Sequence, residues 1–271
     1  MRENEMANDF DSFVVVVTGA STGLGRAIAV ETAQRGAAAV IVNYASSKDE
    51  AQETARLVEA EGAKAVLVQG DVGEDADCRR IAAAAEPFGR LDALFNNAGT
   101  TVFAPNHADL DAVSADDFLR LYRVNVVGAY QMVRAARALL EAAPQPGAVV
   151  NTASIAAVTG IGSSVPYAAS KGAMTTMTLS LARSLAPKIR VNAICPGFID
   201  TPWFGKAMPQ ERVQRIREGT AASVPLKVAS TAEDIAGAAV FLASPASRHV
   251  TGETLLVDAG LHLGYAPMGM R

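Results

Sequence analysis

The sequence predicts a single α/β domain built on a doubly wound, parallel, seven-stranded sheet with helices on both faces. Short β-branched runs alternate with longer segments of helical periodicity along the chain. Most of the short runs are almost continuously apolar, as strands buried on both faces of a parallel sheet must be. The chain has 271 residues, of which 50% are hydrophobic and 19% charged, so it can bury one large core.

The expected strands are runs of Val, Ile, Leu and Ala bounded by polar or glycine-rich turns. Their regular alternation with helices implies right-handed crossovers in an open sheet. In chain order they are expected at Phe13–Val17, Val40–Val42, Ala65–Val68, Ala93–Phe95, Ala148–Asn151, Arg190–Ile194 and Thr254–Val257.

The intervening segments predict helices, two of which begin with recognisable N-cap signals. Ser114 is followed three residues later by Asp117, and Thr231 by Asp234, so each start has an acid in its first turn. The helices are expected at residues 23–35, 47–61, 74–88, 114–142, 166–186, 208–219 and 231–243.

The domain organisation is expected to be simple. Residues 1–11 are polar and acidic and are expected to form a disordered leader. Residues 12–265 are expected to form the one domain, without repeats or low-complexity linkers. Residues 201–225 contain three prolines and a charged stretch, and they resemble an insertion before the last helix and strand.

Charge and composition exclude several function classes. The net charge is −4, whereas proteins that bind nucleic acid by neutralising phosphates are usually basic, so no nucleic-acid partner is expected. Two cysteines and three histidines without a metal-ligand spacing predict neither a disulfide framework nor a metal site. The reducing cytoplasm is the expected compartment. No apolar run has the length of a signal peptide or membrane helix, so no membrane partner is expected.

A glycine-rich segment, TGASTGLG at residues 18–25, follows the first expected strand and precedes a helix. Glycines allow a sharp turn and let a pyrophosphate approach the backbone, while the helix N-terminus attracts an anion. The three glycines would also suit a plain strand–helix turn. Their position after the first strand favours a dinucleotide site, and hence a Rossmann fold.

The end of the second strand bears on the choice between NAD and NADP. Sites that prefer NAD usually place an acid there, but this chain has Asn43 and Tyr44. Ser46, Ser47 and Lys48 could donate to a 2′-phosphate, or they could simply cap a solvated helix. The sequence therefore leans towards NADP, with NAD as the alternative.

Ser154, Tyr167 and Lys171 point to acid–base chemistry. Tyr167 and Lys171 are four residues apart, so a helix places both on one face. A nearby lysine cation is expected to lower the pKa of the phenol and make it a general acid–base. Ser154 follows the fifth strand and could polarise a carbonyl. The Tyr–Lys spacing alone is more typical of an ordinary amphipathic helix, so the joint pattern carries the argument.

Taken together, these segments resemble the short-chain dehydrogenase/reductase family from Val14 to Gly260, and in particular 3-oxoacyl-[acyl-carrier-protein] reductases and glucose dehydrogenases. The Tyr–Lys spacing is unlike that of the divergent enoyl-reductase branch. The matching motifs are TGASTGLG at 18–25, DV at 71–72, NNAG at 96–99, Asn125, Ser154, YAASK at 167–171, PGFIDT at 196–201 and VTGETLLVDAG at 250–260.

The resemblance implies a role for each matching residue. Asn125, Ser154, Tyr167 and Lys171 would form the catalytic tetrad, with Tyr167 as the general acid–base and Asn125 as the anchor of a proton-relay water. The implied cofactor contacts are Gly19, Ser21, Thr22, Gly23, Leu24 and Gly25 at the phosphates and ribose, Asn43, Tyr44, Ser46, Asp71 and Val72 at the adenosine end, and Asn97, Ala98, Gly99, Tyr167, Lys171, Pro196, Gly197, Ile199 and Thr201 at the nicotinamide end.

The activity that follows is hydride transfer between a nicotinamide and a secondary alcohol or ketone. A 3-oxoacyl-thioester reductase and a sugar or polyol dehydrogenase are both expected substrate classes, with residues 201–225 as a substrate lid. The alternative from another class is a non-catalytic dinucleotide-binding sensor, which would not need Ser154, Tyr167 and Lys171 together. By analogy with the family, the chain is expected to form a homotetramer.

Overall fold

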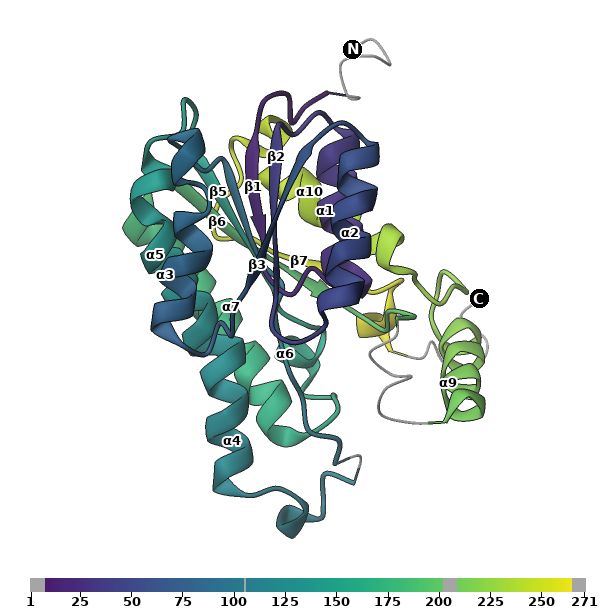
Figure 1. The fold of residues 1–271 in the computed structure, drawn as a ribbon. Helices are drawn as coiled ribbons and strands as arrows, with labels where there is room; N and C mark the ends of the chain where they lie inside the picture. Colours follow the sequence, from purple (N-terminus) through teal and green to yellow (C-terminus); the bar gives the residue numbers. More distant parts are fainter. Residues whose placement is uncertain (1–7, 105, 202–208, 265–271) are drawn as a thin grey trace.

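In the computed structural model, which describes residues 8–104, 106–201 and 209–264, seven parallel strands form one sheet between two layers of helices (Figure 1). The strand order is β3-β2-β1-β4-β5-β6-β7, which confirms the doubly wound sheet. The strands are β1 (Val14–Val17), β2 (Ala39–Tyr44), β3 (Lys64–Gln69), β4 (Ala93–Asn96), β5 (Gly147–Thr152), β6 (Ile189–Pro196) and β7 (Thr254–Val257).

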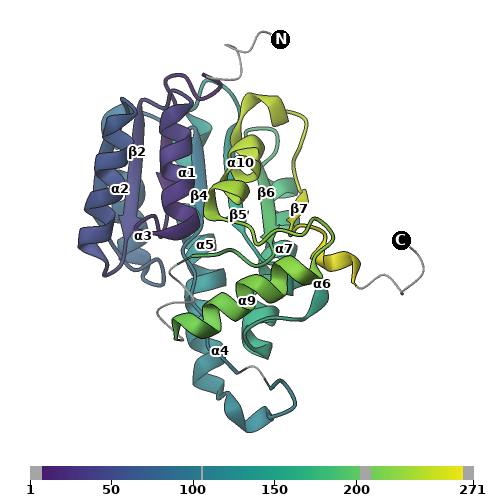
Figure 2. The same cartoon turned by 90° about the vertical axis from the view of Figure 1, so that its right-hand side faces the viewer.

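Each face of the sheet is covered by three helices (Figures 1 and 2). Successive side chains of β1 point to opposite faces of the sheet and are buried on both, which explains why the strand is apolar at every position. Val15 and Val17 pack in the cluster under one helical layer, and Val14 and Val16 in the cluster under the other. The first layer is α1 (Gly23–Gln34), α2 (Lys48–Ala60) and α10 (Ala232–Ala243), and the second is α3 (Asp75–Ala83), α5 (Ala129–Glu141) and α7 (Val165–Leu185).

In the described part of the chain, three further helices lie beyond the carboxyl ends of the strands, where ligands bind in open α/β sheets (Figures 1 and 2). They are α4 (Ala115–Tyr122), α6 (Ala156–Thr159) and α9 (Gln210–Ser223). In this order, β1 and β4 are neighbours while their following segments leave in opposite directions, so the switch point of the sheet lies between them. None of the described helices combines the length and apolarity needed to cross a membrane.

The helix expected at residues 114–142 has a different geometry in its middle. α4 runs into a π-helical segment, Arg123–Gly128, and this continues into α5. Both expected N-caps are confirmed, since Ser114 with Asp117 and Thr231 with Asp234 form capping boxes. The π segment matters because wide turns of this kind often occur at functional sites.

The expected leader is too long at its C-terminal end. Residues 8–11 form turns, and the side chain of Phe10 is fully buried in the core, with its ring centroid 4.9 Å from that of Phe13. The backbone N–H of Phe10 donates to Arg35 at 3.0 Å, and Asp9 pairs with the Arg35 guanidinium at 3.4 Å. Burial of the Phe10 ring thus orders residues 8–11, although the composition around it is polar. Residues 1–7 lie outside the described part.

Smaller differences occur elsewhere. α3 ends at Ala83, and a short 3-10 turn, Glu86–Phe88, takes up the remainder of the helix expected at 74–88. α9 extends four residues beyond the expected helix end, and none of its residues is buried. Residues 202–208 of the expected lid lie outside the described residues. Other 3-10 turns are Leu110–Ala112, Pro245–Ser247 and Leu261–Leu263.

Candidate active site

The glycine-rich loop uses its three glycines for different reasons. Gly19 and Gly23 have φ angles of +61° and +56°, the left-handed region that side chains disfavour. A Cβ at Gly19 would lie 2.8 Å from the Cα of Ala98. A Cβ at Gly25 would lie only 2.3 Å from the carbonyl oxygen of Gly19, so Gly25 is needed for α1 to pack against the loop.

Two asparagines that were expected to contact the cofactor hold this loop. The side-chain oxygen of Asn43 accepts the Gly19 N–H at 3.2 Å, while its Nδ2 donates to the carbonyls of Val68 and Gly70. The Nδ2 of Asn97 donates to the carbonyls of Thr18 and Gly19, each at 3.1 Å. Both side chains are therefore used within the protein, where they shape the loop.

Arg26, in the first turn of α1, is a residue at the loop that the sequence reasoning missed. Its guanidinium donates to the Ser21 carbonyl at 2.7 Å, the Glu50 carbonyl at 2.9 Å and the Thr54 hydroxyl at 2.9 Å. The sequence did contain a signal for this role, namely a basic residue in the first turn of an expected helix. The helix dipole disfavours a cation there unless other groups hold it. Arg26 ties the loop to α2.

The N-terminus of α1 fits the pyrophosphate of a dinucleotide. Its N-cap, Thr22, makes no side-chain hydrogen bond to the first turn, and that turn contains no acidic residue. The N–H groups of a first turn have no partners within the helix, and together with the dipole they attract an anion. Ser21, Thr22 and Gly23 are half-buried, so the loop surface is accessible, whereas Leu24 packs inward.

At the end of β2, Tyr44 is turned into the protein. Its side chain is buried in the core cluster beneath α1, whereas Ala45 and Ser46 are exposed. The Tyr44 ring therefore contributes little surface to a ligand. The expected preference for NADP is therefore left with two observations at this position: there is no acidic residue, and Ser46 is exposed.

The segment after β3 is held from two sides. Asp71 accepts the Gly73 N–H at 2.8 Å, and its other oxygen lies 3.4 Å from the Arg123 guanidinium. Val72 is buried against the π segment, where a Cβ at Gly128 would meet its side chain at 2.8 Å. The adenosine end of the expected site is thus in direct contact with the π-helical segment that contains Asn125.

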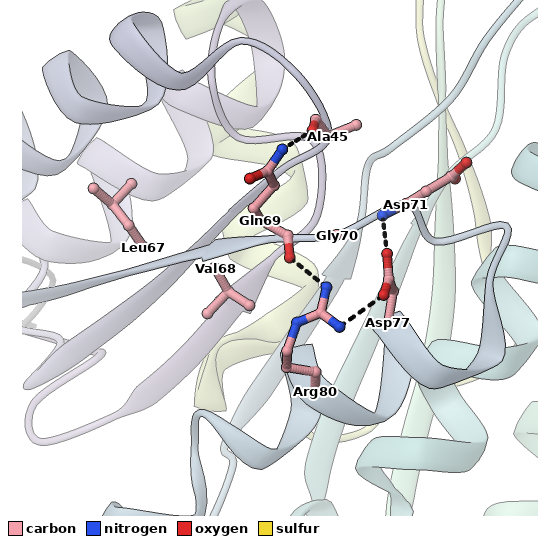
Figure 3. A pocket seen from close by; sticks show the side chains of 8 residues that line it. All are labelled: Ala45, Leu67, Val68, Gln69, Gly70, Asp71, Asp77 and Arg80. Carbon is pink, nitrogen blue, oxygen red and sulfur yellow. Dashed lines mark hydrogen bonds and ion pairs between the residues drawn. The ribbon is translucent and has the colours of Figure 1, made fainter.

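An open cavity of about 590 Å³ adjoins this region at the edge strand β3 (Figure 3). Arg80 spans it, pairing with Asp77 at 2.7 Å and donating to the Gln69 carbonyl at 2.7 Å. Asp77 in turn accepts the Asp71 N–H at 2.8 Å. The lining residues are Ala45, Leu67, Val68, Gln69, Gly70, Asp71, Asp77 and Arg80.

The structure brings three of the four expected catalytic residues together. Tyr167 and Lys171 lie one turn apart on α7, and Lys171 Nζ is 5.7 Å from the centroid of the tyrosine ring. The Ser154 side chain lies near enough to the phenol of Tyr167 to lower its pKa, and Ser154 Oγ accepts the Ala156 N–H at 3.1 Å. The helix starts at the right place because Ser164 caps it by accepting the Tyr167 N–H.

The pKa of Tyr167 is set by burial more than by the lysine cation that was expected to lower it. Burial raises the pKa of Tyr167 above its ordinary value, and the hydrogen bond with Ser154 opposes this rise. Burial also lowers the pKa of Lys171 to about 8. The lysine is 3% exposed and its Nζ donates to the Thr152 carbonyl at 2.7 Å, so desolvation dominates both groups.

Asn125, the fourth residue, acts on the backbone beside this group. Its Nδ2 donates to the Thr100 carbonyl and the Ser170 hydroxyl, both at 3.0 Å, and its Oδ1 accepts the Thr100 N–H at 2.8 Å. A Cβ at Gly99 would lie 3.4 Å from Asn125 Oδ1 and 3.7 Å from Lys171 Nζ. Both amide hydrogens are thus used within the protein. Ser170 was not foreseen, and nothing in its sequence position marks it.

The segment after β6 closes the other side of the site. The Ile155 N–H donates to the Pro196 carbonyl at 2.9 Å, and Gly197 donates to Val257 at 3.1 Å. Ile199 forms a bridge with Ser230. The side chain of Thr201 lies 3.4 Å from where a Cβ of Gly23 would be, so this segment meets the glycine-rich loop.

The described residues contain no group of three or more His, Cys, Asp or Glu side chains placed to hold a metal ion. Both cysteines, Cys78 and Cys195, are buried and free. Burial raises the pKa of each thiol, that of Cys78 to about 12.

Comparison with known proteins gives consistent matches over the whole domain. A family model described as enoyl-(acyl carrier protein) reductase matches residues 19–262. A Streptomyces violaceoruber protein, named as ketoacyl reductase 2 of the granaticin polyketide synthase, is 39% identical over 92% of this chain and 96% of its own length. An L-rhamnose 1-dehydrogenase (NAD(P)+) from a Sphingomonas species has the same identity and coverage. A short-chain dehydrogenase/reductase structure from Burkholderia xenovorans superposes with a TM-score of 0.85, at 40% identity, over 93% of this chain and 99% of that one.

Proposed function

Because the chain belongs to the short-chain dehydrogenase/reductase family, it is an oxidoreductase that uses a nicotinamide dinucleotide and acts on CH–OH donors, and we propose that Tyr167 is its general acid–base. The observation that carries this proposal is the grouping of Ser154, Tyr167 and Lys171, in which Ser154 acts on the phenol and Lys171 Nζ lies 5.7 Å from the centroid of its ring. Ser154 follows β5 and the uncapped N-terminus of α1 follows β1, so in the parallel sheet both lie at the carboxyl ends of the strands.

The proton chemistry follows from the raised pKa of Tyr167. When bound, the nicotinamide supplies or accepts the hydride. The raised pKa of Tyr167 keeps its Oη protonated at neutral pH, so the phenol can donate a proton to a carbonyl oxygen. Ser154 Oγ donates a hydrogen bond to the same oxygen. The Lys171 ammonium then stabilises the phenolate that remains on Tyr167.

The remaining residues would position these groups. Asn125 fixes Thr100 and thereby the backbone that faces Lys171. Because its side-chain donors are already used, a proton-relay water at this residue would bind the main-chain carbonyl or the remaining lone pair of Oδ1. The N–H groups of the glycine-rich loop would hold the pyrophosphate, and Thr201 would close over it.

For the substrate we propose a 3-oxoacyl thioester. Phe103, Val158 and Ile161 are exposed apolar residues in the turn that precedes Tyr167 and in the loop hydrogen-bonded to that turn, which suits an acyl chain better than a polyol. The similarity to the granaticin ketoacyl reductase supports this class. The equal similarity to the L-rhamnose dehydrogenase makes a sugar the second candidate.

For the cofactor we propose a preference for NADP over NAD. The chain has no acid at the end of β2, while Ser46 and Lys48 are exposed beside it. A 2′-phosphate would meet no negative charge there and could accept hydrogen bonds from these two side chains. Tighter binding of NADH than NADPH in a fluorescence titration would contradict this preference.

We also propose a homotetramer in the cytoplasm. Leu119, Tyr130 and Leu179 are exposed apolar residues on α4, α5 and α7, as expected of helices that pack against another subunit. The two free thiols suit a reducing compartment. Sedimentation equilibrium tests the assembly, and a monomer at micromolar concentration would contradict it.

A substrate screen tests the central proposal. Absorbance of the reduced nicotinamide is followed with a 3-oxoacyl thioester and with L-rhamnose, using both cofactors. The thioester should turn over faster, and Tyr167→Phe should lower kcat by at least about a hundredfold while leaving cofactor affinity nearly unchanged. Faster turnover of L-rhamnose would favour the second candidate. Unchanged kcat in Tyr167→Phe would remove the role of Tyr167.

A further inference from the structure

The turn that precedes Tyr167 is joined to the loop after β4 by three hydrogen bonds. The Ala104 N–H donates to the Ser163 carbonyl at 2.8 Å, and the hydroxyls of Thr101 and Ser163 share a short hydrogen bond. The Nε2 of His107 is hydrogen-bonded to the Gly162 carbonyl at 3.1 Å. We call these five residues the clasp.

One side of the clasp lies directly on the tyrosine ring. A Cβ at Gly162 would lie 3.1 Å from Cδ1 of Tyr167 and 3.1 Å from the Cβ of Ala156. Ser164, the next residue after the clasp, is fully buried and caps α7 by accepting the Tyr167 N–H. Residues 162–164 therefore form both a wall of the ring and the start of its helix.

The chain that leads into this wall is weakly held by itself. α6 is a helix of only four residues, and Gly160 after it has a φ angle of +71° with no atom within 4 Å of its Cβ position. Ile161 is 75% exposed, and its N–H donates to the nearby Thr159 hydroxyl. The hydrogen bonds from residues 101–107 thus provide the long-range support of this turn.

We propose that His107 and Thr101 are positioning residues for Tyr167 and that the clasp is the substrate-side wall of the active site. The inference rests on the acid–base role proposed for Tyr167. Proton transfer requires Oη to lie within hydrogen-bond reach of the carbonyl oxygen, and a displacement of about 1 Å can cost about a hundredfold in rate. Loosening Gly162 and Ser163 would allow such a displacement of the ring.

Kinetics of clasp variants test this role. His107→Ala and Thr101→Val should each lower kcat for the 3-oxoacyl thioester by about tenfold, because the ring is misplaced, while the cofactor Kd stays within about twofold. His107→Gln should recover most of kcat, since its amide can still donate to Gly162. Asp109→Asn, an exposed change in the same loop at a side chain that caps no helix, is the control and should leave kcat unchanged.

A second measurement needs no substrate. With tyrosines labelled at Cζ, the NMR resonance of Tyr167, identified by its loss in Tyr167→Phe, should shift in His107→Ala and return in His107→Gln, while that of exposed Tyr130 stays fixed. An unmoved Tyr167 resonance together with a cofactor-saturated kcat within twofold of the parent would overturn the clasp. Failure of the parent chain to reduce any ketone would instead overturn the proposed function, and the NMR result would still decide the clasp.

Discussion

Lys171 Nζ donates to the carbonyl oxygen of Thr152, the last residue of β5, at 2.7 Å. This bond ties α7 to the end of the strand from which Ser154 follows. It also holds the ammonium at a buried position, where its pKa falls to about 8. The burial that lowers the pKa of Lys171 therefore also decreases the free energy of unfolding of the protein.

Lys171→Met should stabilise the protein while removing activity. In the unfolded chain the lysine keeps its ordinary pKa of 10.5, so between pH 8 and 10.5 the unfolded state binds more protons than the folded state. The charge penalty is therefore full below pH 8 and fades as the pH rises towards 10.5. Urea unfolding should show a gain of about 1–3 kcal/mol at pH 7 and a smaller gain at pH 9.5. A loss of stability at pH 7 would contradict it.

The pH dependence of turnover should report the Ser154–Tyr167 pair. The hydrogen bond from Ser154 opposes the rise in the pKa of Tyr167, so Ser154→Ala should raise that pKa further. Alcohol oxidation requires the phenolate, and its rate should therefore increase with pH, with the increase displaced to higher pH in Ser154→Ala. Single-turnover rates measured with saturating cofactor check this. A displacement to lower pH would contradict the assignment.

Gly25→Ala should damage the cofactor site through the loop. The new Cβ would lie 2.3 Å from the Gly19 carbonyl oxygen and 2.5 Å from Asn97 Nδ2, so the loop must move. Cofactor affinity should fall at least about tenfold, a loss of about 1.4 kcal/mol or more. Gly219→Ala is the matched control, because nothing lies within 4 Å of its Cβ position in exposed α9. Equal affinity in both variants, measured by fluorescence titration, would mean that the loop does not bind the cofactor.

How far the sequence predicts the fold can be seen in β1 and Phe10. β1 was found because a strand buried on both faces must be apolar at every position, a signal that depends on the strand alone. Phe10 was missed because its burial depends on a distant partner, the C-terminal end of α1, and a local polar composition hides that contact. The π segment around Asn125 was missed for another reason. Its sequence contains no helix breaker before Gly128, so nothing local distinguishes it from an ordinary α-helix.

For the site, the sequence predicts which residues meet but not their electrostatic state. The four-residue spacing of Tyr167 and Lys171 places both on one face of α7, as observed. The direction of the tyrosine pKa depends on burial from all sides, which no spacing encodes. The clasp is equally hidden, because His107 and Gly162 lie 55 positions apart in segments without a motif.

Arg190→Lys should destabilise the fold without touching the active site. This buried guanidinium has no carboxylate partner in the described structure, and it donates instead to the carbonyls of Leu242, Ala243, Ser244 and Val250 and to the hydroxyl of Ser247. It thereby satisfies carbonyls at the C-terminus of α10, and burial lowers its pKa. An ammonium cannot reach so many acceptors, so the free energy of unfolding should fall by about 2–4 kcal/mol, with the cofactor Kd unchanged. Exposed Arg248→Lys is the control and should change stability by less than about 0.5 kcal/mol. Equal unfolding midpoints in urea for the two variants would show that the hydrogen bonds of the Arg190 guanidinium add no stability beyond that of a lysine at the same position.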